Sequence, residues 1–297
     1  MCAVFIGKQK MNKKAVKCLV LAFLVLFPEI YAFAKETVTV GVFPRRNSSI
    51  TVKMFMPMIK HLEKQTGYQI RLETAKDFPE FWRRVKKGRY DVVHYNQLHY
   101  ILSNKFSDYE VFAINEEFGS SAIAPAIVVR KDSGIRTIKD LKGKNIVFGG
   151  GKLAFISNVG NRILLQEAGL NEPDYHWSFA RNPPNATMAV YFKRADAAGI
   201  GSIGLDIPSI KSKINTDELT FLAVGDIYPH IPWAFSKKLD SSIKKKFKEE
   251  MMSISSSDKG KIVLRKAGMT GLVSSTDEDF EESRKSYKRY LDSKVFR

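Results

Sequence analysis

Residues 85–93 read VKKGRYDVV, and this stretch predicts the end of a helix, a glycine turn and a short buried strand. A similar stretch, VYFKRADAA, follows at residues 190–198, 105 positions later. Around both of them, short apolar runs alternate with helical patterns, which is typical of an α/β fold with mainly parallel sheets. If the two stretches belong to a repeated unit, the chain holds two similar α/β lobes. Alternatively, they are two unrelated strand–helix–strand units that look alike.

The same patterns predict further elements on both sides of these stretches. Strands are predicted at residues 37–43, 69–73, 90–95, 109–114, 122–129, 145–148, 176–179, 195–200 and 219–224. Helices are predicted at residues 50–65, 78–87, 97–106, 137–141, 157–168, 185–194, 241–253, 259–267 and 277–291.

The first 34 residues have the pattern of a secretory signal peptide. Lysines at positions 13, 14 and 17 precede an apolar run at 18–27, Pro28 ends the run, and Ala32 and Ala34 frame a cleavage site. The run is about half as long as a membrane-spanning helix needs. Met11 is a second plausible start, because residues 1–10 add nothing that such a signal requires.

Charge and cysteine content narrow the function classes. The 297-residue chain has 48 Lys and Arg against 31 Asp and Glu, and its net charge of +17 suggests nucleic acid, an anionic membrane surface or an anionic ligand. Cleavage after Ala34 would leave 263 residues with a net charge of +13 and without Cys2 and Cys18, the two cysteines. We therefore expect a soluble, disulfide-free protein of the bacterial periplasm with no transmembrane segment. Nucleic-acid binding is not expected, because the sequence carries no motif for it.

No catalytic or metal-binding pattern stands out. The five histidines include His94 and His99, whose spacing at a strand–loop boundary is not a metal-ligand pattern. The expected mature chain lacks a cysteine nucleophile, and no Gly-x-Ser-x-Gly elbow occurs. We expect a protein that is not an enzyme and that uses no cofactor or metal.

Six motifs, taken in order, resemble a known family. They are GVFP at 41–44, LEKQTG at 62–67, GRYDVV at 88–93, VVRKDSGI at 128–135, DLKGK at 140–144 and ADAAG at 195–199. Together they are similar to the phosphate/phosphite/phosphonate (PhnD-like) substrate-binding proteins of ABC transporters, which have the type II periplasmic-binding-protein fold. The resemblance implies two lobes, residues 35–123 plus 226–297 and residues 124–225, joined by crossing segments near 122–126 and 223–226. It also implies that the C-terminal helices pack on the first lobe.

The resemblance further implies a function. A monomeric protein of this family is expected to capture a small anionic solute, such as phosphate or phosphonate, between its lobes and to deliver it to an ABC permease. One alternative is a sensor of the same fold that reports ligand occupancy to a membrane receptor or kinase. A second alternative is an exported α/β enzyme, which would turn its ligand over.

In the first lobe, five residues are candidates for ligand contact. The resemblance places Tyr100 on the position of a ligand-binding tyrosine, with Tyr95 and Asn96 in the same loop. Arg45 and Arg46 follow the first strand at its carboxyl end, where a guanidinium could grip a carboxylate or phosphate at two points. The alternatives are a packing role for the tyrosine and simple solvation for the arginines.

In the second lobe, the sequence departs from the family pattern. Glycines at 149–151 and Lys152 could bind an anion, with Ser157 or Asn158 capping the next helix. Asn185 is either a ligand contact or the N-cap of the helix at 185–194. The family's Ser-Thr-Ser-Gly run is absent, bulky Phe155 stands in that region, and the family's histidine is missing as well. The identity of the ligand therefore stays open.

Several further residues fall outside this main prediction. Asp206, His230 and Trp233 lie near later loops and are interpreted as structural. The basic stretches at 83–87 and 244–248 lie on predicted helices and indicate solvated faces. The alternative is that these stretches dock on anionic lipid or on a membrane partner.

Overall fold

The computed structural model describes residues 36–46 and 48–295. The predicted signal peptide, its cleavage site after Ala34 and the alternative start at Met11 lie outside the described residues. Thr37–Arg297 form one compact unit, which contains two main β-sheets.

The first sheet has six strands. They are β1 (Thr37–Val42), β2 (Gln69–Glu73), β3 (Val92–His94), β4 (Tyr109–Glu116), β12 (Pro232–Ser236) and β13 (Gly271–Ser274). Their order is β13-β4-β12-β3-β1-β2, and β1 runs parallel to β2 and β3. Trp233 of β12 pairs antiparallel with both His94 and Ala113. The carboxyl ends of β1, β3 and β4 and the start of β12 therefore share one edge.

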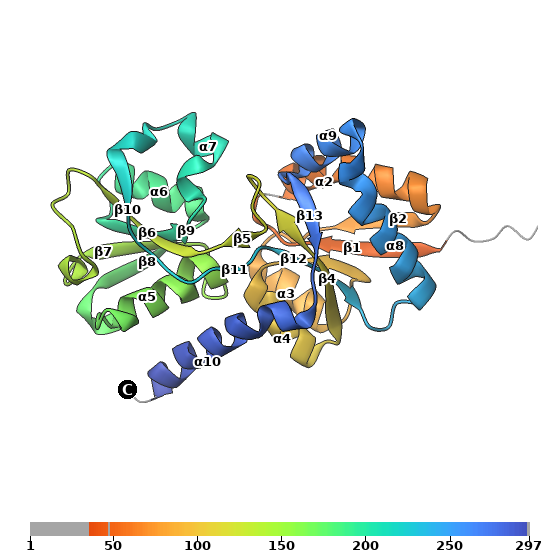
Figure 1. Ribbon diagram of the computed structural model, residues 1–297. Coiled ribbons are helices and arrows are strands. Elements are labelled where there is room, and N and C mark those ends of the chain that lie inside the picture. The colour runs from red at the N-terminus through yellow and green to blue at the C-terminus, as the bar shows by residue number, and fades with distance from the viewer. Residues whose placement is uncertain (1–35, 47, 296–297) are drawn as a thin grey trace, which may run out of the picture. The chain divides into compact units, whose positions relative to one another are not determined.

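Helices cover both faces of this sheet (Figure 1). One face carries α2 (Ser48–Thr66), α8 (Ser241–Ser253) and α9 (Asp258–Ala267), and the other carries α3 (Phe78–Lys86) and α4 (Gln97–Phe106). Side chains alternate along the strands, so Val92 packs in the core under α2, α8 and α9, and Val93 packs under α3 and α4. The turns η6 (Ile254–Ser256) and η7 (Asp277–Phe280) precede α9 and α10 (Glu281–Val295).

The second sheet has five strands. They are β6 (Pro125–Arg130), β7 (Asn145–Gly149), β8 (His176–Ala180), β9 (Ala197–Gly201) and β10 (Leu219–Val224). Their order is β10-β6-β9-β7-β8, with β7 parallel to β8 and β9, and β6 antiparallel to β9 and β10. The order β9-β7-β8 matches β3-β1-β2 of the first sheet, and antiparallel β6 takes the place of β12. This match agrees with the repeat suggested by residues 85–93 and 190–198.

Short helices flank the second sheet. They are η1 (Ile138–Leu141), the π-helix η2 (Phe155–Gly160), α5 (Asn161–Glu167), η3 (Glu172–Asp174), α6 (Pro183–Tyr191), η4 (Gly204–Asp206), α7 (Pro208–Lys211) and η5 (Thr216–Glu218). Leu165 of α5 packs with Phe148 in one core, and Val190 of α6 packs with Val147 in another. Both faces of this sheet are therefore covered.

The chain crosses twice between the two sheets, and the two crossing segments form a short two-stranded ribbon. It consists of β5 (Ala122–Ile123) and its antiparallel partner β11 (Tyr228–Pro229). The predicted α/β fold with two lobes is confirmed. The exact division into residues 35–123 plus 226–297 and residues 124–225 stays a proposal, supported by the sheet that each strand joins.

Some elements differ from the prediction for local reasons. Most strands of each sheet run in one direction, as predicted, and the exceptions are β6, β12 and β13, which pair antiparallel with their neighbours. The predicted strand at 122–129 is split at Ala124 into β5 and β6, and the predicted helix at 137–141 is a 3-10 turn. The pattern does not predict β11, β12 and β13, which are short; β12 begins at Pro232 and β13 at Gly271.

Candidate functional site

Two arginines follow β1 at the edge where the strand ends meet. Arg45 Nη1 lies 3.0 Å from Oε1 of Glu117, which follows β4 at the same edge. Asn115 Nδ2 donates a hydrogen bond to the same carboxylate oxygen over 3.1 Å. Arg46 makes no ion pair with any residue that the structure describes. Glu117 therefore neutralises Arg45, and the guanidinium group of Arg46 has no carboxylate partner of its own.

The electrostatics of this edge favour an anion. Burial alone would raise the pKa of the Glu117 carboxyl, but the Arg45 guanidinium and the Asn115 amide outweigh burial and lower this pKa to about 2. Partial burial of the Arg46 guanidinium and repulsion from Arg45 lower the pKa of Arg46, and Glu117 opposes that shift only in part. Glu117 is thus ionised, and the edge keeps an excess positive charge.

A small recess opens beside these arginines. It is lined by Val42, Phe43, Arg45, Arg46, Thr51, Met54, Phe55, His94, Asn115 and Ala267. The His94 ring stacks on Trp233 with 4.1 Å between ring centroids, and Trp233 Nε1 donates to Asn115 Oδ1 over 2.9 Å. The guanidinium groups and the neighbouring polar side chains of this recess suit contact with a small anion.

His230 lies buried behind the same edge with an unused donor. Its Nδ1 accepts from the Ile231 amide over 2.8 Å, so the proton of the neutral ring belongs on Nε2. Nε2 lies 3.9 Å from Glu117 Oε2 and has no hydrogen-bond partner among residues 36–46 and 48–295. Burial lowers the pKa of His230 to about 4, so the ring is neutral at neutral pH. The fold thus brings His230 and Trp233, which the sequence analysis leaves aside, to the arginine edge.

The two candidate tyrosines are fully buried. The Tyr95 hydroxyl lies 2.6 Å from Ser103 Oγ. The Tyr100 hydroxyl donates to Asp277, and its ring packs on Phe280 with centroids 4.7 Å apart. A ligand could reach either hydroxyl only after these bonds open, so a ligand role for the two tyrosines stays a prediction.

Asn96 caps α4, and its amide is engaged there. Its Oδ1 accepts from the His99 amide over 3.1 Å, and its Nδ2 lies 2.8 Å from His99 Nδ1. The neighbouring Gln97 donates its Nε2 to the Pro229 carbonyl over 2.9 Å. Both side chains therefore stabilise the loop after β3, and ligand contact by Asn96 stays a prediction.

At the second sheet, β7 ends in the predicted glycine turn. A Cβ on Gly149 would lie 2.5 Å from the backbone of α6, and Gly150 has φ +109°, so both positions require glycine. Ser157 Oγ donates to the Gly149 carbonyl, and Asn158 Nδ2 donates to the Lys152 carbonyl over 3.0 Å. These two side chains hold the turn, while the side chain of Lys152 is exposed.

The helix caps predicted at this edge are wrong. Neither Ser157 nor Asn158 caps a helix, because both lie inside the π-helix that begins at Phe155. Asn182 rather than Asn185 caps α6, since its Oδ1 accepts from the Asn185 amide over 3.0 Å. The side chain of Asn185 is exposed in the first turn of α6, and a ligand contact from it stays a prediction.

A buried arginine that the sequence analysis misses organises the second edge. The Arg162 guanidinium carbon lies 4.5 Å from the centroid of Phe148 and 4.3 Å from that of Trp177. Arg162 Nη1 pairs with Glu172 at 2.7 Å, and its Nε donates to Asn158 over 2.8 Å. Arg162 therefore holds Asn158, which in turn holds the glycine turn. The four-residue spacing of Asn158 and Arg162 on a helical segment is the signal that could have indicated this pair.

The bulky residues near the turn have packing roles. Phe155 lies in an apolar cluster with Leu98, Tyr228 and Tyr290, in which Phe155 and Tyr228 meet edge to face at 5.0 Å. Asp206 makes an exposed ion pair with a lysine of α7 at 2.8 Å. Phe155 thus packs inside an apolar cluster, and the carboxylate of Asp206 is engaged by Lys211.

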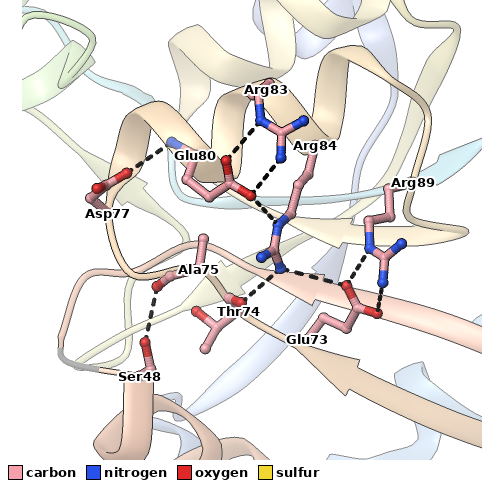
Figure 2. Close-up of polar contacts among 9 residues, drawn as sticks. All are labelled: Ser48, Glu73, Thr74, Ala75, Asp77, Glu80, Arg83, Arg84 and Arg89. Atoms are coloured by element: carbon pink, nitrogen blue, oxygen red, sulfur yellow. Dashed lines mark hydrogen bonds and ion pairs between the residues drawn. The ribbon is translucent and has the colours of Figure 1, made fainter.

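The basic stretch at 83–87 lies on α3, and Figure 2 shows that its arginines are paired. Arg83 and Arg84 both donate to Glu80 over 2.8 Å, which lowers the pKa of that carboxyl to about 2. Arg89 makes a two-point bond to Glu73 at 2.7 Å, and Arg84 Nη1 reaches the same carboxylate at 3.7 Å. This network ties α3 to β2 and occupies all three guanidinium groups.

Within the described ranges, no group of three His, Cys, Asp or Glu side chains could hold a metal ion. No helix in this part of the chain is long and apolar enough to cross a membrane.

Sequence comparison identifies relatives of this chain. A family model described as ABC transporter, phosphonate, periplasmic substrate-binding protein matches residues 40–280. The phosphonates-binding periplasmic protein of Escherichia coli strain K12 is 21% identical over 248 residues, which cover 82% of this chain and 73% of that protein.

Solved structures share the fold. The binding protein component of an ABC phosphonate transporter from Pseudomonas aeruginosa has a TM-score of 0.76 and 16% identity, with 88% of each chain covered. PhnD1 from Prochlorococcus marinus, in complex with methylphosphonate, has a TM-score of 0.75 and 14% identity, with 86% of this chain and 98% of that chain covered. The type II fold that the resemblance implies is confirmed. The chain belongs to the phosphonate family of periplasmic substrate-binding proteins of ABC transporters.

Proposed function

We propose that this chain binds a small phosphorus oxyanion, a phosphate or phosphonate, in the periplasm and delivers it to an ABC permease. The observation that carries the proposal is that Arg45 and Arg46 lie together at the carboxyl ends of the strands, where Arg45 pairs with Glu117 and Arg46 has no ion pair in the described part of the chain. Ligands of open α/β sheets bind at such ends. Two guanidinium groups with one counter-charge suit a doubly charged oxyanion.

The second lobe would complete the site. The Gly150 amide donates to the Ala180 carbonyl over 2.9 Å, so the glycine turn would offer the Gly151 amide, and Lys152 would offer an exposed charge. A ligand that contacts both edges binds the closed arrangement of the lobes more tightly than the open one, and this difference in affinity drives closure. Arg45, Arg46 and Lys152 are therefore the residues that we expect to contact the ligand first.

The relatives support this class of ligand. The Escherichia coli relative is named for phosphonates, and the Prochlorococcus structure contains methylphosphonate. Since the matching family consists of transport proteins, a sensory role is not proposed, and we expect the ligand to be released unchanged.

A thermal-shift screen tests the proposal. The chain that begins at Lys35 would be melted with phosphate, phosphite, methylphosphonate, sulfate, acetate and glycerol. A ligand at 100 times its dissociation constant should add about 2.7 kcal/mol of stability. Stabilisation by a phosphorus oxyanion, with the ligand unchanged in its phosphorus NMR spectrum, supports binding without catalysis. A protein that responds only to acetate or glycerol contradicts the proposed ligand class.

A further inference from the structure

The basic stretch on α8 differs from the one on α3, because most of its lysines lack carboxylate partners. Lys244 pairs with Glu110 at 2.8 Å, and Lys246 lies 5.7 Å from the centroid of the Tyr68 ring. Lys245 is exposed and makes no ion pair within the described part of the chain. This second basic stretch therefore keeps charge available for a partner.

Exposed basic side chains also occur on two neighbouring helices, α2 and α9. Side chains of α2, α8 and α9 share one core under the same face of the first sheet, so their outer sides face solvent together (Figure 1). These helices hold eleven Lys and Arg against four Asp and Glu, a net charge of +7. We call their exposed basic residues the lysine face: Lys53, Lys60, Lys64, Lys245, Lys246, Lys259, Lys261, Arg265 and Lys266. Among these nine, Lys261 alone has a carboxylate partner in the described ranges, the exposed Asp258 at 3.3 Å.

Apolar side chains lie between these lysines. Val52, Met56 and Pro57 line a shallow groove on α2 that Lys53 and Lys60 also border. On α9, the Ile262 side chain is 46% exposed. Cations around exposed apolar groups are the composition of protein surfaces that lie at the headgroup level of a bilayer.

The chain also enters the fold beside the lysine face. Thr37, the first residue of β1, pairs with Gln69, the first residue of β2. Gln69 follows the end of α2 at Thr66 by three residues. Lys246 of the lysine face lies over the ring of Tyr68, the residue before Gln69.

We propose that the lysine face docks this protein on a bilayer surface that carries anionic lipid headgroups. Eight of its nine cations are lysines, whose charges on flexible stems suit the diffuse potential of such a surface. A partner with fixed carboxylates would be matched better by the two-point geometry of arginine. The arginines of α3 make such two-point pairs within the chain and are not part of the docking surface.

Vesicle co-sedimentation tests the proposal. The chain from Lys35 is used, because Thr37–Arg297 form one compact unit and an attached leader would itself bind lipid. In 0.15 M salt it should bind phosphatidylcholine vesicles that contain 30% phosphatidylglycerol, and it should not bind pure phosphatidylcholine. Each lysine lost should weaken partitioning about fivefold. The test variant combines Lys60→Gln, Lys245→Gln, Lys259→Gln and Lys266→Gln and should bind at least a hundredfold more weakly.

A matched control removes the same charge elsewhere. It combines Lys86→Gln, Lys87→Gln, Lys139→Gln and Lys142→Gln, and it should bind within about fivefold of the unaltered chain. Equal losses in the two variants would show that net charge alone acts and would overturn the proposal. Absence of binding to anionic vesicles, or binding that needs a membrane protein in the vesicle, would overturn it as well. If the test variant fails to melt cooperatively, the pair Lys245→Gln and Lys266→Gln replaces it, with a loss of about twenty-five-fold expected.

Discussion

The edges of the two sheets use their arginines in opposite ways. At the first edge, Arg45 and Arg46 border a recess; Arg45 pairs with Glu117, and Arg46 has no ion pair in the described ranges. At the second edge, Arg162 is 2% exposed, lies between two aromatic rings and pairs with Glu172.

This difference distinguishes an arginine that stabilises the fold, Arg162, from arginines that can bind a ligand, Arg45 and Arg46. The buried Arg162 guanidinium, whose Nε and Nη1 are bonded to Asn158 and Glu172, stabilises the loop that it holds. An exposed pair with too few carboxylates lowers its electrostatic energy when an anion arrives. The second edge would therefore contribute the Gly151 amide and Lys152, and the first edge would contribute guanidinium groups.

The largest expected effect is on stability, from Arg162→Met. Removing this guanidinium leaves Asn158 without its partner and Glu172 without its counter-charge, and Glu172 can regain water because its side chain is 31% exposed. We expect a loss of about 3 kcal/mol in the free energy of unfolding. Urea unfolding measures this, with exposed Arg136→Met as a control that should change by less than about 0.5 kcal/mol. A loss below about 1 kcal/mol would show that Arg162 is not a structural anchor.

Glu117→Gln should produce a pH-dependent loss of stability. The folded pKa of Glu117 is about 2, below the ordinary value of 4.5, so its stabilisation is present above pH 4.5 and disappears as the pH falls toward 2. We expect the variant to be less stable by about 2–3 kcal/mol at pH 7. Unfolding of both proteins between pH 2 and 7 checks this. A difference that does not shrink toward pH 2 would contradict the ion pair with Arg45.

Arg46→Gln should weaken ligand binding without loss of stability. A hydrogen bond to a charged ligand contributes about 2 kcal/mol, so affinity for methylphosphonate should fall about thirtyfold. The melting point without ligand should stay the same or rise, because Arg46 and Arg45 repel each other. Calorimetry measures the affinity, and an unchanged value would remove the first edge from the site.

Lys152→Ala should have a smaller effect on the same affinity. Its side chain is exposed and screened by salt, so about 1 kcal/mol, or fivefold, is expected. The loss should shrink in 0.5 M salt. Lys139→Ala, which removes an exposed lysine away from the glycine turn, serves as control and should bind normally.

Tyr100→Phe has the smallest expected effect and decides between two roles for its hydroxyl. Loss of the bond to Asp277 should lower the free energy of unfolding by about 1 kcal/mol and leave affinity within twofold. A tenfold loss of affinity with unchanged stability would instead support the ligand contact that the family resemblance implies.

The sequence predicts elements whose signals are local. The bounds of α4 and α8 agree with the structure to the residue, because Asn96 and Asp240 cap them and apolar periodicity continues to their ends. In contrast, β12 and β13 depend on distant partners: Trp233 pairs with His94, and Val273 pairs with Ile114. Such pairing leaves no local signal in short strands that begin with proline or glycine.

The residues of the candidate site also divide into those with a local sequence signal and those that depend on distant partners. Arg45 and Arg46 could be named because they directly follow a strand, and carboxyl ends of parallel strands form ligand sites. Glu117 and His230 join that edge only after β4 and β12 pair across the sheet. The burial of Arg162 could not be predicted either, since Phe148 and Trp177 come from two different strands.

Isothermal titration of methylphosphonate into the chain from Lys35 tests the central claim most directly. We expect one site per chain, with an affinity about thirtyfold weaker in Arg46→Gln. A folded protein that gives no binding heat and no thermal shift with methylphosphonate, phosphate or phosphite would contradict the account.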